Sequence, residues 1–345
     1  MDLRTRTKAW AWLAALLVLS LSMSLRAGAA SAVTADTEVL RIADAPLFAP
    51  EYVFWLRQAA RNLTATQGPE ALDAWSTERK GMSLQTYLTG QAIQSARRVR
   101  AIRAQAQALG LQFSAQDLKR IEDKRLDGIR AYGGVMPYLA IVRRMYVSEE
   151  VLDQLSQSDL LGERLFERLY GTKGERCSDA QVADYVAAQQ LQRAKYIHVA
   201  AGEGRRAQMQ ALVERLDAGG DAEALFDELG PRYNQDTRMA AQPQGRLFAA
   251  GSMGEAFDRA YAALGENQHS GVVDDGSGYT ILLRLPIRPD TRPDDDEHTL
   301  RYWAAYNHLF KPQVDAWAAQ LTVAYTPAFA ALDAVALARW QVPGG

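Results

Sequence analysis

Three apolar side chains in the second half of the chain have the types and spacing of a small binding socket. Met253 and Phe257 lie four residues apart in a segment, residues 253–264, that we expect to be helical, so they would share one helix face. A soft thioether beside an aromatic ring can hold a saturated ring by dispersion, and Phe248 is placed to close one side. The alternative interpretation is that Met253 and Phe257 are ordinary core residues.

The chemistry that such a socket suits is rotation about the peptide bond before proline. This rotation faces a barrier of about 18–20 kcal/mol, because the resonance of the amide must be lost. The two isomers of an X-Pro bond differ by only about 0.5–1 kcal/mol, yet they exchange over tens of seconds or more. A catalyst therefore needs no nucleophile, metal or cofactor. It needs an apolar socket for the proline ring and a polar surround that favours the twisted amide.

Side chains suited to this polar surround occur on two expected strands and in two connecting segments. Tyr196 and His198 are two residues apart in the expected strand 194–199, so alternation puts them on the same face. Thr280 lies in the expected final strand of this region, Ser277 lies in the turn before it, and Asp236 lies in an irregular segment. The histidines show no metal-ligand spacing, so we expect no metal site.

The order of these segments resembles the parvulin family of peptidyl-prolyl isomerases. The resemblance runs from residue 194 to residue 285 and includes the motif at 248–260, with Gly251, followed by Leu264, Ser270 and Gly278. It implies that Met253, Phe257 and Phe248 form the proline pocket, which we favour over the core interpretation. It also implies that Asp236 stands where parvulins carry Cys or Asp, and that Ser277 matches a Ser or Thr often found before the last strand.

This chain departs from the parvulin pattern at both histidine positions. The first-strand histidine of the family falls on Tyr196, and the final-strand histidine falls on Thr280. The two hydroxyls can supply part of the hydrogen-bond network. His198 is either a stand-in for the lost imidazole or a structural residue. The family's Gly-Gly-Asp-Leu-Gly loop is replaced by Gln-Pro-Gln-Gly-Arg at residues 242–246.

The wider pattern predicts an α+β fold in which a parvulin-like domain is inserted into a helical module. We expect the helical chaperone-like domain at 33–190, a four-stranded antiparallel sheet with helices at 191–288, and a C-terminal helix and strand at 294–340. This outline resembles the exported SurA/PrsA-type foldases. The resemblance implies that the helix 301–317 packs back on the N-terminal helices, and it suggests that the strands around Val39 and Val323 pair.

The N-terminus has the layout of a secretory signal. Arg4, Arg6 and Lys8 precede an apolar run at residues 9–25, and small residues then offer cleavage after Ala29 or Ala32. We therefore expect residues 1–32 to be a signal peptide, with a retained single-pass anchor through residues 9–25 as the alternative. Both interpretations place the remainder outside the cytosol, in the periplasm or on the outer face of the cytoplasmic membrane.

Composition excludes several other classes of function. The 345 residues are 48% hydrophobic, which is enough for a real core, and the formal net charge of −2 gives no basic footprint for nucleic acid. The single cysteine, Cys177, cannot form an internal disulfide.

Two hypotheses follow, and they share one fold and one compartment. In the first, the protein is a foldase that binds unfolded or proline-containing client polypeptides and isomerises their X-Pro bonds. In the second, it is a chaperone that binds extended clients without catalysis. The loss of both histidines favours the second, whereas Met253, Phe257 and Asp236 favour the first. A third, weaker hypothesis is an envelope assembly factor with one dedicated partner.

Overall fold

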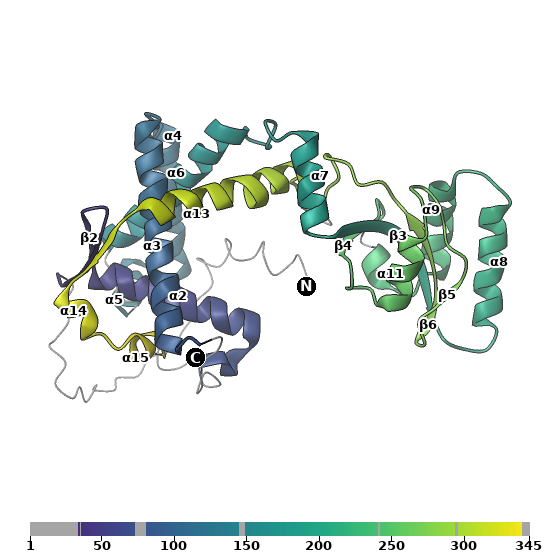
Figure 1. Ribbon diagram of the computed structural model, residues 1–345, viewed down its shortest axis with the longest axis horizontal. Helices are drawn as coiled ribbons and strands as arrows, with labels where there is room; N and C mark the ends of the chain where they lie inside the picture. Colours follow the sequence, from purple (N-terminus) through teal and green to yellow (C-terminus); the bar gives the residue numbers. More distant parts are fainter. Residues whose placement is uncertain are drawn as a thin grey trace. The chain divides into compact units, whose positions relative to one another are not determined.

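The computed structural model describes residue 34 and residues 36–72, 81–144, 149–240, 242–293 and 296–339, and these residues form two compact units. The described part of one unit is residues 170–309, and the other combines residues 34–169 with residues 310–339 (Figure 1). The expected signal segment, residues 1–32, lies outside the described residues. Among the helices that are described, none combines the length and the apolar character that crossing a membrane requires.

In the unit formed by residues 34–169 and 310–339, segments from the two ends of the described chain meet in a three-stranded sheet. Strand β1 (Glu38–Ile42) turns into β2 (Ala45–Phe48) through two residues with positive φ, Ala43 at 48° and Asp44 at 67°. A two-residue turn of this kind matches the twist of an antiparallel hairpin. Strand β7 (Val323–Tyr325) pairs antiparallel with the other edge of β1, so the expected pairing of these two segments is confirmed.

Helices from both ends of the sequence pack into the core of this unit. Helix α13 lies against α3, where Arg97 donates to the carbonyls of Ala319 at 2.7 Å and Leu321 at 2.8 Å. The core is continuous from β1 through α2 and α3 to α15. The helical module is thus built from N- and C-terminal segments, as expected, but only the part of the expected helix 301–317 that belongs to α13 lies in this unit. Its helices are α2 (Ala49–Gln67), η2 (Pro69–Leu72), α3 (Leu84–Ala108), α4 (Ala115–Ala131), α5 (Val135–Arg144), α6 (Glu149–Tyr170), α13 (Lys311–Gln320), α14 (Pro327–Ala330) and α15 (Ala334–Arg339).

A buried carboxylate ties α4 to α6. Asp117 forms a capping box with Ser114, as the Ser-x-x-Asp pattern predicts, and its Oδ1 also pairs with Arg164 at 2.5 Å. The guanidinium lowers the pKa of Asp117 to about 2, even though burial opposes the charge.

The other unit is built on a four-stranded antiparallel sheet in the order β4-β3-β6-β5, which confirms the expected sheet. Its strands are β3 (Leu191–Ala200), β4 (Arg246–Ala249), β5 (Val273–Asp274) and β6 (Gly278–Arg284). Its helices are α7 (Asp179–Ala188), α8 (Arg205–Asp217), α9 (Ala222–Tyr233), α10 (Thr237–Ala240), α11 (Glu255–Ala262) and α12 (Leu300–Trp303), followed by the π-helix η3 (Ala304–Phe310).

The two faces of this sheet have different partners. One face presents Ile197, Val199 and Ile281 to a core that also contains side chains of α8 and α9. The opposite face presents Ala194, Tyr196 and Leu282 to a smaller cluster that includes side chains of α11. Because alternate strand residues point to opposite faces, every candidate residue of β3 and β6 lies on the α11 face.

Candidate functional site

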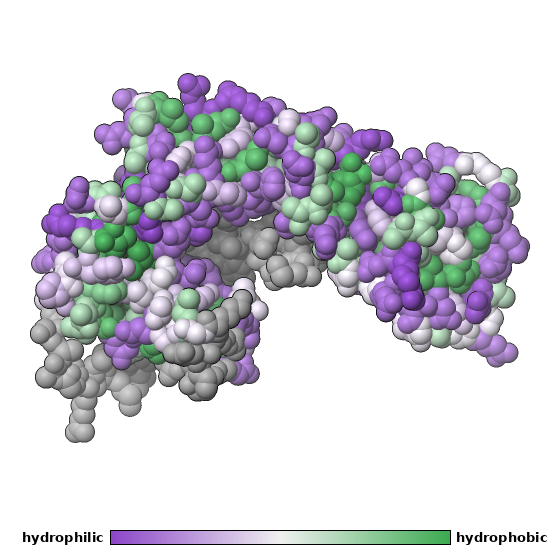
Figure 2. All heavy atoms as spheres, viewed as in Figure 1, coloured by the Kyte–Doolittle hydropathy of each residue, from purple (hydrophilic) through white to green (hydrophobic). Residues whose placement is uncertain are grey.

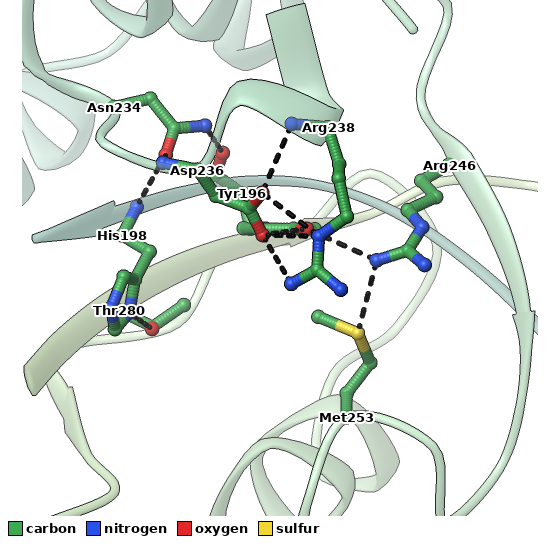
Figure 3. Close-up of polar contacts among 8 residues, drawn as sticks. All are labelled: Tyr196, His198, Asn234, Asp236, Arg238, Arg246, Met253 and Thr280. Carbon is green, nitrogen blue, oxygen red and sulfur yellow. Dashed lines mark hydrogen bonds and ion pairs between the residues drawn. The ribbon is translucent and has the colours of Figure 1, made fainter. Parts of the chain in front are cut away.

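The loop after α9 is held against β3 by one asparagine. Asn234 Oδ1 accepts from the main-chain N–H groups of His198 and Asp236, each at 3.0 Å, and Asn234 Nδ2 donates to the Tyr196 carbonyl at 2.7 Å. These three hydrogen bonds fix the position of Asp236 relative to the α11 face of the sheet (Figure 3).

Tyr196 and Asp236, predicted from separate segments, are in direct contact. The Tyr196 hydroxyl donates to Asp236 Oδ2 at 2.8 Å. Arg238 donates to the same carboxylate at 2.7 Å, and this guanidinium is the main reason that the pKa of Asp236 falls well below its ordinary value. Burial, followed by the hydrogen bond to Asp236, raises the pKa of Tyr196 to about 12. At neutral pH the pair is therefore a protonated phenol donating to an ionised carboxylate.

Arg246 joins this polar pair to the predicted socket. Its Nη1 lies 3.3 Å from the Tyr196 hydroxyl and 3.5 Å from the Met253 sulfur (Figure 3). The phenol thus donates one hydrogen bond and accepts another, which fixes its orientation. One continuous series of contacts therefore runs from Asp236 through Tyr196 and Arg246 to Met253.

The socket residues gather in one aromatic cluster on the same face of the sheet. The ring of Phe257 makes edge contacts with Tyr196 at 5.8 Å and with Phe248 at 5.5 Å between centroids. Phe248 and Phe257 are each only 4% exposed, whereas Met253 is partly exposed. The two phenylalanines therefore form the floor of the cluster, and Met253 is the predicted socket residue that a ligand reaches most easily.

The helix at this site begins later than expected. We expected Met253 and Phe257 on one helix face, but α11 begins at Glu255 and Met253 belongs to the preceding turn. Gly254 has φ 92° and ψ 157°, a conformation that L-residues rarely adopt and that a helix does not contain. The four-residue spacing argument is therefore wrong, although Met253 still packs against the Phe257 cluster.

The remaining predicted site residues form separate contacts. His198 Nδ1 lies 2.9 Å from Thr280 Oγ1 on the α11 face, and neither side chain has a hydrogen bond to Tyr196 or Asp236. Gly278 lets the His198 ring approach, since a Cβ at that position would lie 2.8 Å from its Cε1. Ser277 lies in the exposed turn and donates to Asp275 at 2.7 Å. The structure brings Tyr196 and Asp236 together, pairs His198 with Thr280, and leaves Ser277 apart.

Two other features of this unit do not coincide with the predicted site. Within the described ranges, no cluster of His, Cys, Asp and Glu side chains has the composition to hold a metal ion. A shallow hollow of about 530 Å³ lies at the start of α8, and its lining includes Gly202, Arg206 and Tyr279 but none of the predicted site residues.

Sequence reasoning missed three residues of the site: Asn234, Arg238 and Arg246. A signal for each of them is present in the sequence. Arg246 lies two residues before Phe248, so a strand over residues 246–249, as in β4, places both side chains on one face. Asn234 and Arg238 flank Asp236 at two residues on either side, a spacing that local side-chain hydrogen bonds to the backbone favour.

Comparisons with known proteins return foldases and chaperones. No protein-family model matches the chain, and no curated protein matches it. PrsA from Bacillus subtilis matches with 20% identity and a TM-score of 0.28, over 70% of this chain and 86% of its own. PrsA from Streptococcus pneumoniae, described as a foldase protein, matches with 16% identity and a TM-score of 0.25, over 70% and 84%.

A structure from Campylobacter jejuni also matches, in a report that describes PEB4 and the periplasmic protein Cj1289 as SurA-like chaperones. The identity is 16% and the TM-score is 0.25, over 72% of this chain and 85% of the other. These structures belong to the PrsA and SurA-like group that the order of elements in this sequence resembles. Because the TM-scores lie well below 0.5, we derive neither fold nor function from the matches, and both rest on the geometry described above.

Proposed function

We propose that this protein is an exported foldase that binds proline-containing segments of client polypeptides and isomerises their X-Pro bonds as parvulins do. The observation that supports this most is the contact between the polar pair and the apolar cluster. The ring of Tyr196, whose hydroxyl donates to Asp236, makes an edge contact with the ring of Phe257, and Met253 packs against the same cluster. A proline ring on Met253 would bring its imide bond beside the ionised carboxylate.

The proposed chemistry needs only this arrangement of charge and apolar surface. Planar amide resonance places negative charge on the carbonyl oxygen, and rotation removes part of that charge. An ionised Asp236 near the carbonyl oxygen of the X-Pro bond would disfavour the planar form relative to the twisted one, and the aromatic floor would exclude the water that stabilises the planar form. Tyr196 would hold the carboxylate in place through its hydrogen bond. Its phenol would stay protonated at neutral pH and would not act as a general acid or base.

The same structure supports a second candidate, a chaperone that binds without catalysis. Phe248 and Phe257 pack on each other and are almost fully buried, so the floor offers little free apolar area. Arg238 neutralises the carboxylate that would oppose planar resonance. Exposed apolar side chains on two neighbouring helices of the helical unit, Leu118 of α4 and Met136 of α5, offer surface to an unfolded client. Most of the face seen in Figure 2 is hydrophilic, with apolar residues between the hydrophilic ones.

Exchange between proline isomers in short peptides separates the two candidates. The purified protein is added at catalytic concentration, and the exchange rate is read from NMR line shapes or from protease-coupled kinetics. Acceleration supports the isomerase. Absence of acceleration, together with suppressed aggregation of an unfolded client, supports the chaperone and refutes the enzyme.

Export is part of the proposal and rests on the N-terminal sequence. The basic residues before the apolar run 9–25 orient the rest of the chain away from the cytosol. Mass spectrometry of the protein from envelope fractions tests this. A mature N-terminus at Ala30 or Val33 indicates cleavage, and an intact N-terminus in the membrane fraction indicates an anchor. An intact chain found only in the cytosolic fraction contradicts export.

A further inference from the structure

Arg246 is a cation at the edge of the socket whose charge has no counterpart in the described part of the chain. Both of its side-chain contacts use Nη1, and both partners, the Tyr196 hydroxyl and the Met253 sulfur, are uncharged. No carboxylate among the described residues lies within 4.0 Å of its guanidinium. Its Nε and Nη2 donate to no described residue and are not fully buried, so a ligand can reach them.

Two other cations of this unit already have carboxylate partners, whereas Arg284 donates to the Leu264 carbonyl and lies over the ring of Tyr261. Arg238 is bound to Asp236, and Lys195, buried on the opposite face of the sheet, pairs with Asp227 at 2.6 Å and Glu223 at 3.0 Å. The polar group beside Met253 therefore contains one carboxylate and two guanidiniums. A partly buried guanidinium that has lost part of its hydration gains most from an anion supplied by a ligand.

We infer that Arg246 selects clients that carry an acidic residue directly beside the proline. This rests on the proposed function, since it places the proline ring on Met253. The guanidinium contacts the same sulfur that would contact the ring. A neighbouring residue has its Cα only about 3.8 Å along the chain, so its carboxylate is within reach of Nε and Nη2, which can bind it in the two-pronged way that suits arginine. A contact to a main-chain carbonyl would give no preference among side chains.

Peptides that differ in one side chain test this inference. The full-length protein is titrated with proline peptides carrying Glu, Gln or Lys immediately before or immediately after the proline, and affinity is read from the methyl signal of Met253. We expect Glu to bind about tenfold more tightly than Gln at one of the two positions, and the advantage to shrink at high salt because part of the pair is exposed.

Three variants make the result specific. Arg246→Gln should reduce the Glu preference to less than about twofold, and Arg246→Glu should reverse it in favour of Lys. Arg259→Gln is the matched control, because it removes an equal charge from an exposed residue of α11 that pairs with Glu255. The control should keep the preference of the unaltered protein.

Each outcome decides the inference. Equal binding of Glu and Gln peptides by the unaltered protein, or a Glu preference that survives in Arg246→Gln, overturns the role of Arg246 and leaves the proposed function intact. Binding without accelerated isomer exchange rejects the isomerase while the selectivity still stands. If no proline peptide binds at all, the proposed function fails, and this inference fails with it.

Discussion

Replacing Tyr196 by phenylalanine removes one hydroxyl from the middle of the polar network and leaves the aromatic packing in place. The ring contact with Phe257 at 5.8 Å is kept, whereas the hydrogen bond to Asp236 at 2.8 Å is lost. Hydrogen bonds to charged groups contribute about 1.5–3 kcal/mol. Asp236 keeps Arg238 as a partner and is therefore not left unpaired, so we expect a cost of about 1.5 kcal/mol, at the lower end of that range.

Hydrogen exchange of the main-chain amides in β3 and β6 measures this cost within one unit, which a global unfolding curve of a two-unit protein does not. Tyr196→Phe should lower the protection of these amides about tenfold, since 1.4 kcal/mol corresponds to a factor of ten. Tyr279→Phe is the control, because this hydroxyl has no hydrogen bond to another described residue, and it should change protection less than about twofold. Unchanged protection in Tyr196→Phe, or equal losses in both variants, would refute the network.

Three further predictions concern the socket, the helical unit and the cysteine. Phe257→Leu, which keeps the site apolar, should weaken proline-peptide binding more than Tyr196→Phe does in an NMR titration, and equal effects would mark Phe257 as ordinary core. Because the pKa of Asp117 is lowered to about 2, its ionised form stabilises the helical unit above the unfolded pKa near 3.8. The protection of the main-chain amides of α4 and α6 from hydrogen exchange should lose a contribution of about 2 kcal/mol between pH 4.5 and 2, and Asp117→Asn, unlike the exposed control Asp123→Asn, should remove that contribution. Burial raises the pKa of Cys177, so a thiol reagent should react about 100-fold more slowly with the native protein than in urea, and equal rates would contradict its burial.

The sheet that carries the site could be predicted because its signals are local. The strand patterns at 194–199 and 279–285 correspond to β3 and β6, and the same alternation put Tyr196 and His198 on one face. The hairpin partner β2 was not predicted, because the turn that makes it uses Ala43 and Asp44 at positive φ, and neither residue is a strong turn signal of the Asn-Gly type.

The contacts within the site could be predicted only in part, because they depend on which long side chains meet. The resemblance to parvulins implied that Asp236 belongs to the same site as Tyr196, but it could not show that His198 pairs with Thr280 or that Arg246 lies over Met253. Arginine has many rotamers, and the one observed is selected by Tyr196 of β3 and by Met253 of the turn before α11. The turn at Gly254 was missed for a similar reason, since the sequence around it also fits a continuous helix.

The basic stretch on α3 illustrates the same limit. A run of charged residues usually marks a solvated helix face, but the run in α3 joins this helix to other elements through Arg97, Arg98, Arg100 and Arg103. Arg100 pairs with the buried Glu51 at 2.9 Å, and Arg103 donates to Ser158 at 2.7 Å. Charged residues whose sequence pattern is typical of a solvated surface therefore help to assemble the helical unit.

An NMR titration of the full-length protein with a short proline peptide tests the central claim most directly, namely that the α11 face of the sheet binds proline. We expect the signals of Met253, Phe257 and Arg246 to shift together with one affinity, while those of Met209, in the core between the opposite sheet face and α8, stay in place. Shifts confined to other surfaces, or no shift around Met253, would contradict the claim.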